Sequence, residues 1–331
     1  MKADVHGTGR FPFQSVLVTG GAGFIGTRVV ARLRRRHIRT IVVDNGYVGL
    51  PLPAPDDGLV PLKIDIRDRA ALASVLSEHK PDGIVHLAAV HHIPTCEREP
   101  HFALDVNVLG TQSLLDAAAD VGVKNIVFAS SGAVYKWEDG PLDEMRTRTG
   151  ATDVYSISKL TNEYQLACWA GRVGGRAHIA RVFNTIGERD PNGHLIPDIL
   201  AQLSRQNDVV RLGNITPKRD YIYVDDVADG FVALLEGLHE GKAVDHFNLC
   251  TGQELSVGEL VSLIGRLLGV NVRVESDPAR MRKSDRPQQL GDPSKLKQSR
   301  NWRPRWKIND ALAQIITELG YPVVEDATSH A

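Results

Sequence analysis

The chain has few cysteines, no long apolar segment and almost no net charge. Its 331 residues include three cysteines, Cys96, Cys168 and Cys250, which lie far apart and match no metal-ligand spacing. An odd number of cysteines argues against a disulfide framework and favours a reducing compartment. The cysteine pattern therefore supports neither a disulfide-rich secreted protein nor a cysteine-ligated metal.

The absence of long apolar segments excludes further classes of protein. No run of about 18 apolar residues is present, as a transmembrane helix requires, and the N-terminus lacks the apolar core of a signal peptide. The formal net charge is −1, so no overall field attracts nucleic acid or a membrane surface. We therefore expect a cytoplasmic protein that has neither nucleic acid nor a membrane as a partner.

What the sequence does contain is an alternation of strand and helix patterns from residue 15 to about 182. This alternation is typical of an α/β fold with a doubly wound parallel sheet. Strands are expected at 16–19, 40–44, 60–64, 83–87, 125–129 and 177–182. Helices are expected at 24–36, 68–79, 101–121 and 153–170, and later near 196–206, 226–238, 256–268 and 309–319.

The length of the chain suits one large domain or two fused domains. We expect residues 15–183 to form the first domain, with 221–249 returning to its sheet. A smaller C-terminal domain is expected to contain 184–220 and 250–321. The termini, residues 1–14 and 323–331, are predicted to be loose.

The most informative motif is a glycine cluster at the end of the first predicted strand. Gly20, Gly23 and Gly26 follow a G-x-x-G-x-x-G spacing, and Phe24 and Ile25 begin the next helix. In such a strand–turn–helix one glycine makes the tight turn, one lets the backbone approach a pyrophosphate, and one lets the helix pack on the strand. The pyrophosphate is then held by N–H groups at the helix N-terminus. The motif predicts a Rossmann-type dinucleotide-binding domain.

An acidic residue follows the second predicted strand, where a dinucleotide site needs one. Asp44 lies 18 residues after Gly26. Its carboxylate would accept hydrogen bonds from the adenine-ribose hydroxyls and would repel a 2′-phosphate, which favours NAD over NADP. Asp65 and Ile66 follow the third strand and are expected at the adenine edge.

A tyrosine and a lysine four residues apart form the candidate catalytic group. Tyr155 and Lys159 share one face of a predicted helix, and Ser131 follows the strand at 125–129. Oxidising a sugar carbinol requires removal of the hydroxyl proton. A neighbouring ammonium and a positive nicotinamide ring would bring the pKa of the phenol towards neutral pH, and the serine hydroxyl can orient the same oxygen.

These motifs resemble those of extended short-chain dehydrogenase/reductases of the nucleotide-sugar type, and the chain is similar to UDP-hexose and UDP-glucuronate 4-epimerases. The resemblance runs from about residue 15 to 320. Its landmarks are Thr19 to Gly26, Asp44-Asn45, Asp65-Ile66, His86 to Ala89, Asn107 to Thr111, Ser130-Ser131, Val134-Tyr135, Tyr155 with Lys159, Arg181 to Asn184, Arg219 to Ile222 and Asp292 to Lys295. They are specific for the superfamily but say little about the sugar.

Carried over by position, the resemblance makes Tyr155 the base, supported by Lys159 and Ser131, and implies the remaining contacts. The cofactor is also expected to touch Phe24, Ile25, Asn45, Leu87, Ala88, Ala89, Asn107, Tyr155 and Lys159. The nucleotide sugar is expected at His91, Ser131, Tyr155, Asn184, Leu195, Arg219, Arg282 and Asp285. An arginine presents a planar fork to phosphate oxygens. The alternatives are a salt bridge beside a helix for Arg219 and a plain surface position for Arg282.

Two departures from the family pattern bear on the reaction. Gly132 and Ala133 stand where the family's dehydratases and decarboxylases carry acids, which argues against those reactions. Small residues there would also leave room for a 4-keto sugar to swing. The pair His91-His92 is not the family's usual segment; it is expected to border the sugar, and no third ligand beside it suggests a metal site.

The sequence therefore predicts an NAD-dependent nucleotide-sugar 4-epimerase that forms a homodimer and takes a nucleotide-diphosphate sugar, expected to be UDP-linked. The sugar would be oxidised at C4 and reduced again on the opposite face. A ketoreductase or dehydrogenase of the same superfamily is the alternative with a related activity. A nucleotide-sensing protein without activity is the alternative from another class, and it would not need Tyr155 or Lys159.

Overall fold

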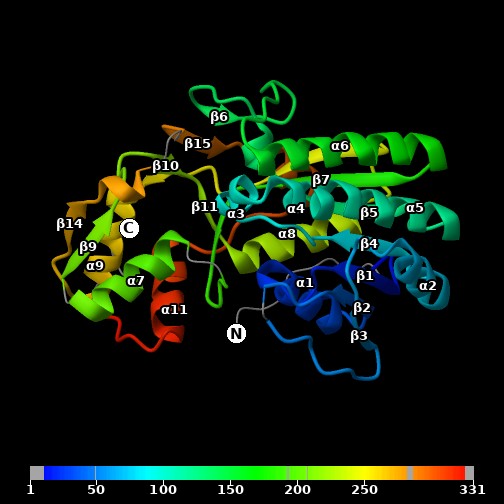
Figure 1. The fold of residues 1–331 in the computed structure, drawn as a ribbon, viewed down its shortest axis with the longest axis horizontal. Coiled ribbons are helices and arrows are strands. Elements are labelled where there is room, and N and C mark those ends of the chain that lie inside the picture. Colours follow the sequence, from blue (N-terminus) through cyan, green and yellow to red (C-terminus); the bar gives the residue numbers. More distant parts are fainter. Residues whose placement is uncertain (1–10, 49, 192–193, 207, 282–285, 325–331) are drawn as a thin grey trace.

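The computed structural model describes residues 11–48, 50–191, 194–206, 208–281 and 286–324. Figure 1 shows a larger part built around a central sheet and a smaller part beside it. The prediction of an α/β fold with a doubly wound parallel sheet is confirmed. No helix within the described ranges is long and apolar enough to cross a membrane.

Seven parallel strands form the central sheet. In spatial order they are β12 (Val244–Leu249), β7 (Arg176–Val182), β5 (Asn125–Ser131), β4 (Gly83–His86), β1 (Ser15–Thr19), β2 (Arg39–Asp44) and β3 (Leu59–Lys63). The chain runs outward from β1 through β2 and β3 on one side, and through β4 and its successors on the other. A ligand of such a sheet binds outside the carboxyl ends of the strands at this switch point, between β1 and β4.

Helices cover both faces of the sheet because its strands are apolar on both sides. In β1, Val16 and Val18 belong to one core and Leu17 belongs to the other, as the alternation of side chains along a strand requires. The first face is covered by α1 (Phe24–Arg35), α8 (Val224–Glu236) and α10 (Ser294–Arg300). The second is covered by α2 (Arg69–His79), α5 (Thr111–Val121) and α6 (Val154–Val173), with the short α3 (Ile93–Arg98) and α4 (Pro100–Leu104) nearby.

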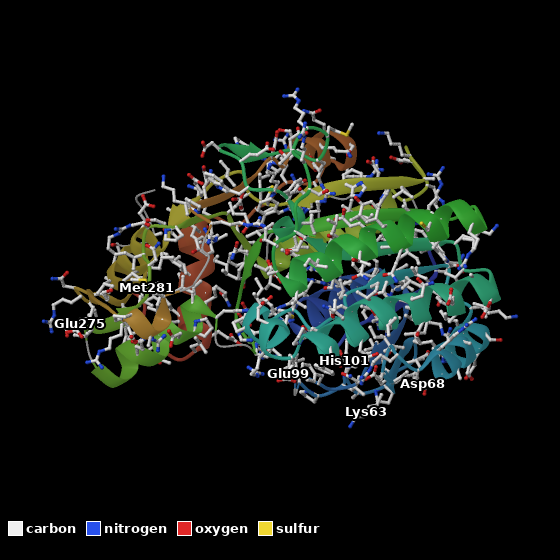
Figure 2. The ribbon with its side chains drawn as sticks, turned by 45° about the horizontal axis from the view of Figure 1, so that its top comes forward. Lys63, Asp68, Glu99, His101, Glu275 and Met281 are labelled. Carbon is white, nitrogen blue, oxygen red and sulfur yellow. The ribbon has the colours of Figure 1, made fainter. Side chains whose placement is uncertain are left out.

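The smaller part has a core of its own. It contains α7 (Leu195–Gln206), α9 (Val257–Leu268), α11 (Ile308–Glu318) and the paired strands β9 (Val209–Leu212) and β14 (Arg273–Ser276). Two small sheets lie between the parts: β8 (Asn184–Ile186) with β11 (Tyr221–Tyr223), and the series β13 (Leu255–Ser256), β10 (Lys218–Arg219), β15 (Gln288–Gly291) and β6 (Pro141–Leu142). In Figure 2, Glu275 lies at the outer end of the smaller part, whereas Lys63 and His101 lie on the larger part.

The ends of the described chain are packed, although the sequence predicts loose termini at 1–14 and 323–331. Phe13 is 1% exposed and belongs to the core of the larger part. The N–H of Val324 donates to the carbonyl oxygen of Leu267 at 2.9 Å. Phe13 and Val323 thus pack against apolar cores, whereas looseness of the terminal stretches as a whole stays a prediction.

The predicted boundaries between two domains are also not followed strictly. Leu296 and Trp302 fall in the segment 250–321, yet they are buried in the core on the first face of the sheet with Phe231 and Leu249. The reason is that α8 and β12 return to the sheet and bring apolar surface, which the following segment covers.

The helix predicted at 101–121 is interrupted by a π-helical turn, Asp105–Gly110, between α4 and α5. Such turns change the pairing of backbone carbonyls and often lie at functional sites. Here the carbonyl oxygen of Asn107 accepts from Thr111 Oγ1 at 2.6 Å and from Asn162 Nδ2 at 2.9 Å. These side chains satisfy the irregular backbone where it passes behind the loop after β4.

Candidate active site

A large cavity of about 630 Å³ lies at the carboxyl ends of β1 and β4 and is walled by both parts of the molecule. Most residues selected from the sequence line it, namely Gly20, Gly23, Phe24, Ile25, Gly26, Asp44, Asn45, Ile66, Leu87, Ala88, Ala89, His91, Ser131, Tyr155, Lys159, Asn184, Leu195 and Arg219. Asp65 and Asn107 are not among the described residues that line it. Arg282 and Asp285 lie outside the described residues.

The glycine loop holds α1 close to the end of β1. Gly20 has a φ of +68°, and a Cβ there would lie 2.7 Å from the backbone nitrogen of Ala88. A Cβ at Gly26 would overlap the carbonyl oxygen of Gly20. Within the described part of the chain, no side chain caps the first turn of α1, whose N-cap is Gly23. The N–H groups of that turn can therefore meet phosphate oxygens.

Asp44 is fixed beside this loop. Its carboxylate accepts from the backbone N–H of Ala22 at 3.1 Å and from that of Gly46 at 2.8 Å. The side chain is buried at the end of β2 but lines the cavity. Because a carboxylate has about four acceptor sites, lone pairs remain for ribose hydroxyls.

Asp65 is engaged by protein groups instead of facing the cavity. Its carboxylate accepts from Nε and Nη2 of Arg67 at 2.9 and 2.8 Å, and from Nδ2 of Asn45 at 2.9 Å. The hydrogen bonds from the Arg67 guanidinium hold the pKa of Asp65 well below its usual range. The arginine also bonds Asp105 at 2.8 Å. Asp65 thus orients Asn45, while Ile66 beside it reaches the cavity.

The loop after β4 forms the wall opposite the glycine loop. Leu87, Ala88 and Ala89 line the cavity directly. Asn107 lies behind them and is 1% exposed. Its side chain accepts from the N–H of Val90 at 2.8 Å and donates to the carbonyl of Val90 at 2.9 Å. In this position Asn107 holds the loop, and the cofactor contact that the resemblance implies stays a prediction.

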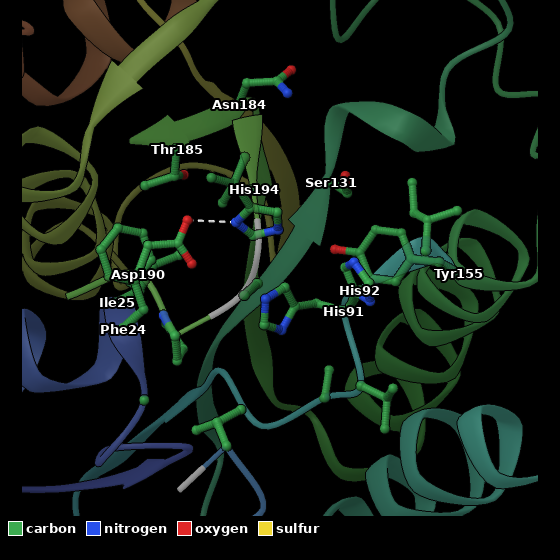
Figure 3. Close-up of a pocket in the computed structure, with 18 of the residues that line it drawn as sticks. Phe24, Ile25, His91, His92, Ser131, Tyr155, Asn184, Thr185, Asp190 and His194 are labelled. Atoms are coloured by element: carbon green, nitrogen blue, oxygen red, sulfur yellow. Dashed lines mark hydrogen bonds and ion pairs between the residues drawn. The ribbon is translucent and has the colours of Figure 1, made fainter. Parts of the chain in front are cut away.

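Tyr155 and Ser131 face each other in the cavity, from the start of α6 and the end of β5 (Figure 3). Lys159 lies one helical turn after the tyrosine, and its Nζ donates to the carbonyl oxygen of Ala129 at 2.8 Å. The same Nζ lies 4.8 Å from the ring centre of Phe128 and 5.9 Å from that of Tyr155. The backbone contact fixes the ammonium near the phenol.

Burial shifts the pKa of both titratable groups. It raises the pKa of Tyr155 to about 12, although the hydrogen bond with the Ser131 hydroxyl acts in the opposite direction. It lowers the pKa of Lys159 to about 7. The expected phenol pKa near neutrality is therefore not produced by the chain's own groups, because desolvation of the phenolate outweighs the hydrogen bond. A cationic ring placed beside Tyr155 would act against the burial.

A buried network lies directly behind these residues. Ser130 Oγ donates to Glu163 at 2.5 Å, and Arg181 binds both oxygens of that carboxylate at 3.0 and 2.7 Å. Although burial raises the pKa of Glu163, its hydrogen bonds to His246 and Arg181 bring it down to about 2. The carboxylate therefore links α6 to β5 and β7, and holds Tyr155 in register with the serines.

Asn184, Leu195 and Arg219 line the end of the cavity that is formed by the smaller part. They come from β8, the start of α7 and β10. Nη1 of Arg219 donates to the carbonyl oxygens of Lys218 and Arg286, both at 2.8 Å. These contacts with the backbone hold a guanidinium at the cavity wall.

Arg280, Asp190 and His194 also line the cavity, although no sequence motif marks them. Arg280 donates to Asp198 Oδ2 at 2.6 Å. His194 directly precedes Leu195, which was predicted to contact the nucleotide sugar. This adjacency was the one feature of the sequence that pointed to His194. The arginine could be found only by its closeness in sequence to the predicted Arg282.

His91 is half-buried and lies in a group of three histidines. The ring centres of His91 and His92 are 6.0 and 6.1 Å from that of His194. Burial lowers the pKa of His91 to about 4. In the described ranges, no group of three His, Cys, Asp or Glu side chains is placed to hold a metal ion. Contact of His91 with a sugar stays a prediction.

Comparison with known families agrees with this geometry. A family model described as "NAD dependent epimerase/dehydratase family" matches residues 16–250. The chain belongs to this family. The match begins at the second residue of β1 and ends just after β12, so it contains all of the central sheet except Ser15.

Individual relatives within the family carry different activities. GDP-6-deoxy-D-mannose reductase of Pseudomonas aeruginosa is 29% identical over 314 residues, which is 92% of this chain and 97% of that one. UDP-glucose 4-epimerase of Rhizobium meliloti is 32% identical, covering 89% of this chain and 93% of the relative. The solved structure of UDP-glucose 4-epimerase from Brucella ovis in complex with NAD has a TM-score of 0.83 at 29% identity, covering 94% and 100%.

Gly132, at a position where the family varies, has a different role from the one expected. The small residues Gly132 and Ala133 were expected to leave room for a sugar. Gly132 is buried and does not line the cavity, and a Cβ there would lie 3.0 Å from Gln289 Nε2 and 3.1 Å from the Phe183 ring. At Gly132 the expected space is absent, because the side chains of Phe183 and Gln289 fill it, whereas for Ala133 the expectation stays a prediction. Neither residue supplies an acid, as the sequence shows.

Proposed function

We propose that the chain is an NAD-dependent nucleotide-sugar 4-epimerase, which oxidises its substrate transiently at C4 and reduces it again on the opposite face. The observation that carries this proposal is the meeting of Tyr155, Lys159 and Ser131 in the same cavity as the glycine loop. The family and its UDP-glucose 4-epimerases support it.

The proposal is tested by incubating the protein separately with UDP-glucose, dTDP-glucose and GDP-mannose, without added cofactor. Nuclear magnetic resonance of each mixture detects the C4 epimer. Formation of an epimer from one of these sugars supports the proposal. The proposal would be contradicted if none of these sugars were epimerised and the protein instead converted a 4-keto nucleotide sugar only when NADH was added.

The described residues fit NAD. The glycine loop offers a backbone cradle that a Cβ would fill, the first turn of α1 offers N–H groups, and Asp44 is fixed beside both. Gly20, Gly23 and that turn would hold the pyrophosphate, and Asp44 would hold the adenine ribose. When bound, NAD supplies the hydride acceptor and donor that side chains lack.

The chain's own residues handle the proton and the position of the sugar. Tyr155 takes the proton of the 4-hydroxyl as C4 is oxidised and returns it as C4 is reduced. Ser131 hydrogen-bonds the phenol oxygen and orients it. Lys159, held by the Ala129 carbonyl, stabilises the phenolate by its charge. Arg219 anchors the diphosphate, so the sugar can present either face while it stays bound.

A nucleotide-sugar ketoreductase or dehydrogenase is the second candidate. The GDP-6-deoxy-D-mannose reductase of P. aeruginosa favours it, since this relative aligns over 97% of its length. A reductase consumes one reduced cofactor in each turnover, whereas an epimerase consumes none. Loss of NADH absorbance during conversion of a 4-keto nucleotide sugar would therefore favour this candidate.

The purified protein is expected to contain bound NAD and not NADP. Asp44 accepts from the backbone on one side and faces the ribose site on the other, where its charge would repel a 2′-phosphate. Mass spectrometry of the nucleotide released by denaturation checks this. Predominant NADP would show that Asp44 does not face the ribose.

Replacing Arg219 with alanine is expected to weaken nucleotide-sugar binding by roughly 10- to 150-fold, because a charge-assisted contact contributes about 1.5–3 kcal/mol. NAD binding should change less, since the glycine loop is untouched. Calorimetric titration with UDP-glucose measures the first affinity, and titration of cofactor-free protein with NAD measures the second. Arg211→Ala is the matched control, because Arg211 is exposed in β9 and its guanidinium bonds the exposed Glu275, away from the cavity lining. Equal affinities in both variants would remove Arg219 from the site.

The expected homodimer has a candidate surface. Ile157 and Tyr164 are 47% and 63% exposed on one stripe of α6, and Leu109 nearby is 59% exposed. Large apolar side chains that gather on one face often mark an interface. Light scattering should give twice the chain mass for the native protein and a lower mass for the Leu109→Glu, Tyr164→Glu variant. A monomeric native protein would contradict this proposal.

A further inference from the structure

Three histidines line one wall of the cavity, and the reaction described above uses none of them. His91 and His92 come from the loop after β4, and His194 comes from the segment before α7 (Figure 3). The two ring-centre distances to His194 are 6.0 and 6.1 Å. Nδ1 of His194 lies 2.5 Å from Oδ2 of Asp190. We call these four residues the histidine cluster.

The cluster can gain more positive charge than its own carboxylate balances. A histidine gains a positive charge when its imidazole takes up a proton, and Asp190 is the one carboxylate among these four residues. The other charged or titratable groups that line the described cavity are Asp44, Tyr47, Tyr155, Lys159, Asp198, Arg219, Tyr221 and Arg280. Of their two carboxylates, Asp44 is fixed beside the glycine loop and Asp198 is paired with Arg280. An anionic ligand would therefore complement the protonated cluster.

The electrostatic surroundings of His91 link the binding of an anion to the protonation of the His91 imidazole. Burial, and then the neighbouring His194, lower the pKa of His91 to about 4, whereas Asp190 acts to raise it. Lys159 and His92 act in the same direction as His194. A bound anion would act as Asp190 does and would favour the charged imidazole.

We propose that the histidine cluster is a proton-linked recognition site for the diphosphate of the nucleotide sugar. This inference rests on the proposed function, because it takes a nucleotide-diphosphate substrate as given. The complex then binds more protons than the free protein, so affinity increases as pH falls. For uptake of a single proton the change is at most about tenfold in Kd per pH unit. Contacts with sugar hydroxyls alone would leave the number of bound protons unchanged.

The test is calorimetric titration with UDP-glucose, dTDP-glucose and GDP-mannose near about pH 6.5, in buffers with different enthalpies of ionisation. The slope of the observed enthalpy against the buffer enthalpy gives the number of protons taken up. The Tyr155→Phe variant is used, because it prevents turnover and removes the phenol proton. Saturation with NAD fills the other pyrophosphate site, and the diester diphosphate of a nucleotide sugar does not itself titrate near this pH.

We expect proton uptake on binding, and its loss in a protein that also carries His91→Asn and His194→Asn. Each single substitution should lower the uptake, which keeps the test available if the double variant does not fold. His101→Asn is the matched control and should keep the full uptake, since His101 is exposed on α4 (Figure 2) and is not among the described residues that line the cavity.

Three outcomes would overturn the inference. Nucleotide-sugar binding without proton uptake, or with equal uptake in the double variant, removes this role of the cluster and leaves the proposed function intact. Equal uptake when NAD alone is added to cofactor-free protein would assign the cluster to the cofactor. Failure of all three nucleotide sugars to bind at any pH would contradict the proposed function, and this inference with it.

Discussion

Replacing Tyr155 with phenylalanine is expected to lower kcat by about 10²- to 10⁴-fold, which is the usual contribution of a positioned acid–base group. The substitution removes the phenol oxygen that faces Ser131 and keeps the ring at the start of α6. Turnover of the preferred nucleotide sugar measures the loss. NAD content, measured by mass spectrometry, should be unchanged because Gly20 and Asp44 are on other elements.

The matched control is Tyr164→Phe, which makes the same chemical change in the same helix. Tyr164 is 63% exposed, so its hydroxyl does not reach the cavity. Its kcat should stay within about twofold of the native value, because phenylalanine keeps the ring that Tyr164 contributes to the proposed dimer surface and changes nothing at the cavity. If Tyr155→Phe also kept nearly native turnover, another group would have to move the proton.

Replacing Gly26 with alanine is expected to weaken NAD binding by as much as about 150-fold, or 3 kcal/mol, the upper end of the usual cost of overpacking. The added methyl would overlap the carbonyl oxygen of Gly20 and would lie 2.7 Å from Cα of Gly21. Because both obstacles are backbone, relief requires the glycine loop itself to shift. Titration of cofactor-free protein with NAD measures the change.

Gly171→Ala is the matched control, because Gly171 also lies inside a helix but has no heavy atom within 4 Å of its Cβ position. Alanine is favoured over glycine in helices by about 1 kcal/mol, so this variant should be slightly more stable and should bind NAD normally. A Gly26→Ala protein that binds NAD as tightly as Gly171→Ala would show that the loop does not need to approach the cofactor so closely.

The sequence predicted β1, β2 and β4 well because each is a short apolar run with β-branched residues that ends at a polar residue. β1 ends before Gly20 and β2 ends at Asp44, so local residue types fix both the strand and the placement of the site at its end. The Tyr155–Lys159 pair was accessible for a similar reason, since helical spacing alone puts both on one face.

Features that depend on packing between distant segments could not be predicted in this way. Asp65 has the expected position after β3, but Arg67 and Asn45 engage its carboxylate. Asn107 matches a family landmark, yet the π-helical turn places it behind the cavity wall. A motif identifies the residue and its place along the chain, whereas the neighbours that compete for its polar atoms are known only from the fold.

The histidine cluster and the surroundings of Gly132 could not be predicted for the same reason, because both depend on segments that are distant in the sequence. His91 and His194 are more than a hundred positions apart, and nothing local to either sequence segment indicates that they meet. The glycine at position 132 suggests empty space in the folded protein, but the side chains of Phe183 and Gln289 fill that space.

The fate of hydrogen in deuterated water tests the 4-epimerase proposal most directly. The protein is incubated in deuterated water with the nucleotide sugar that it converts, and both isomers are examined by nuclear magnetic resonance and mass spectrometry. Gly132 and Ala133 supply no acid for chemistry at the neighbouring carbon, so the 4-keto sugar should only be reduced again. We expect a C4 epimer that keeps its original hydrogen at C4 and carries no deuterium at C5. Deuterium at C5, or a 4-keto-6-deoxy product, would contradict a simple 4-epimerase and indicate a dehydratase or a 3,5-epimerising enzyme.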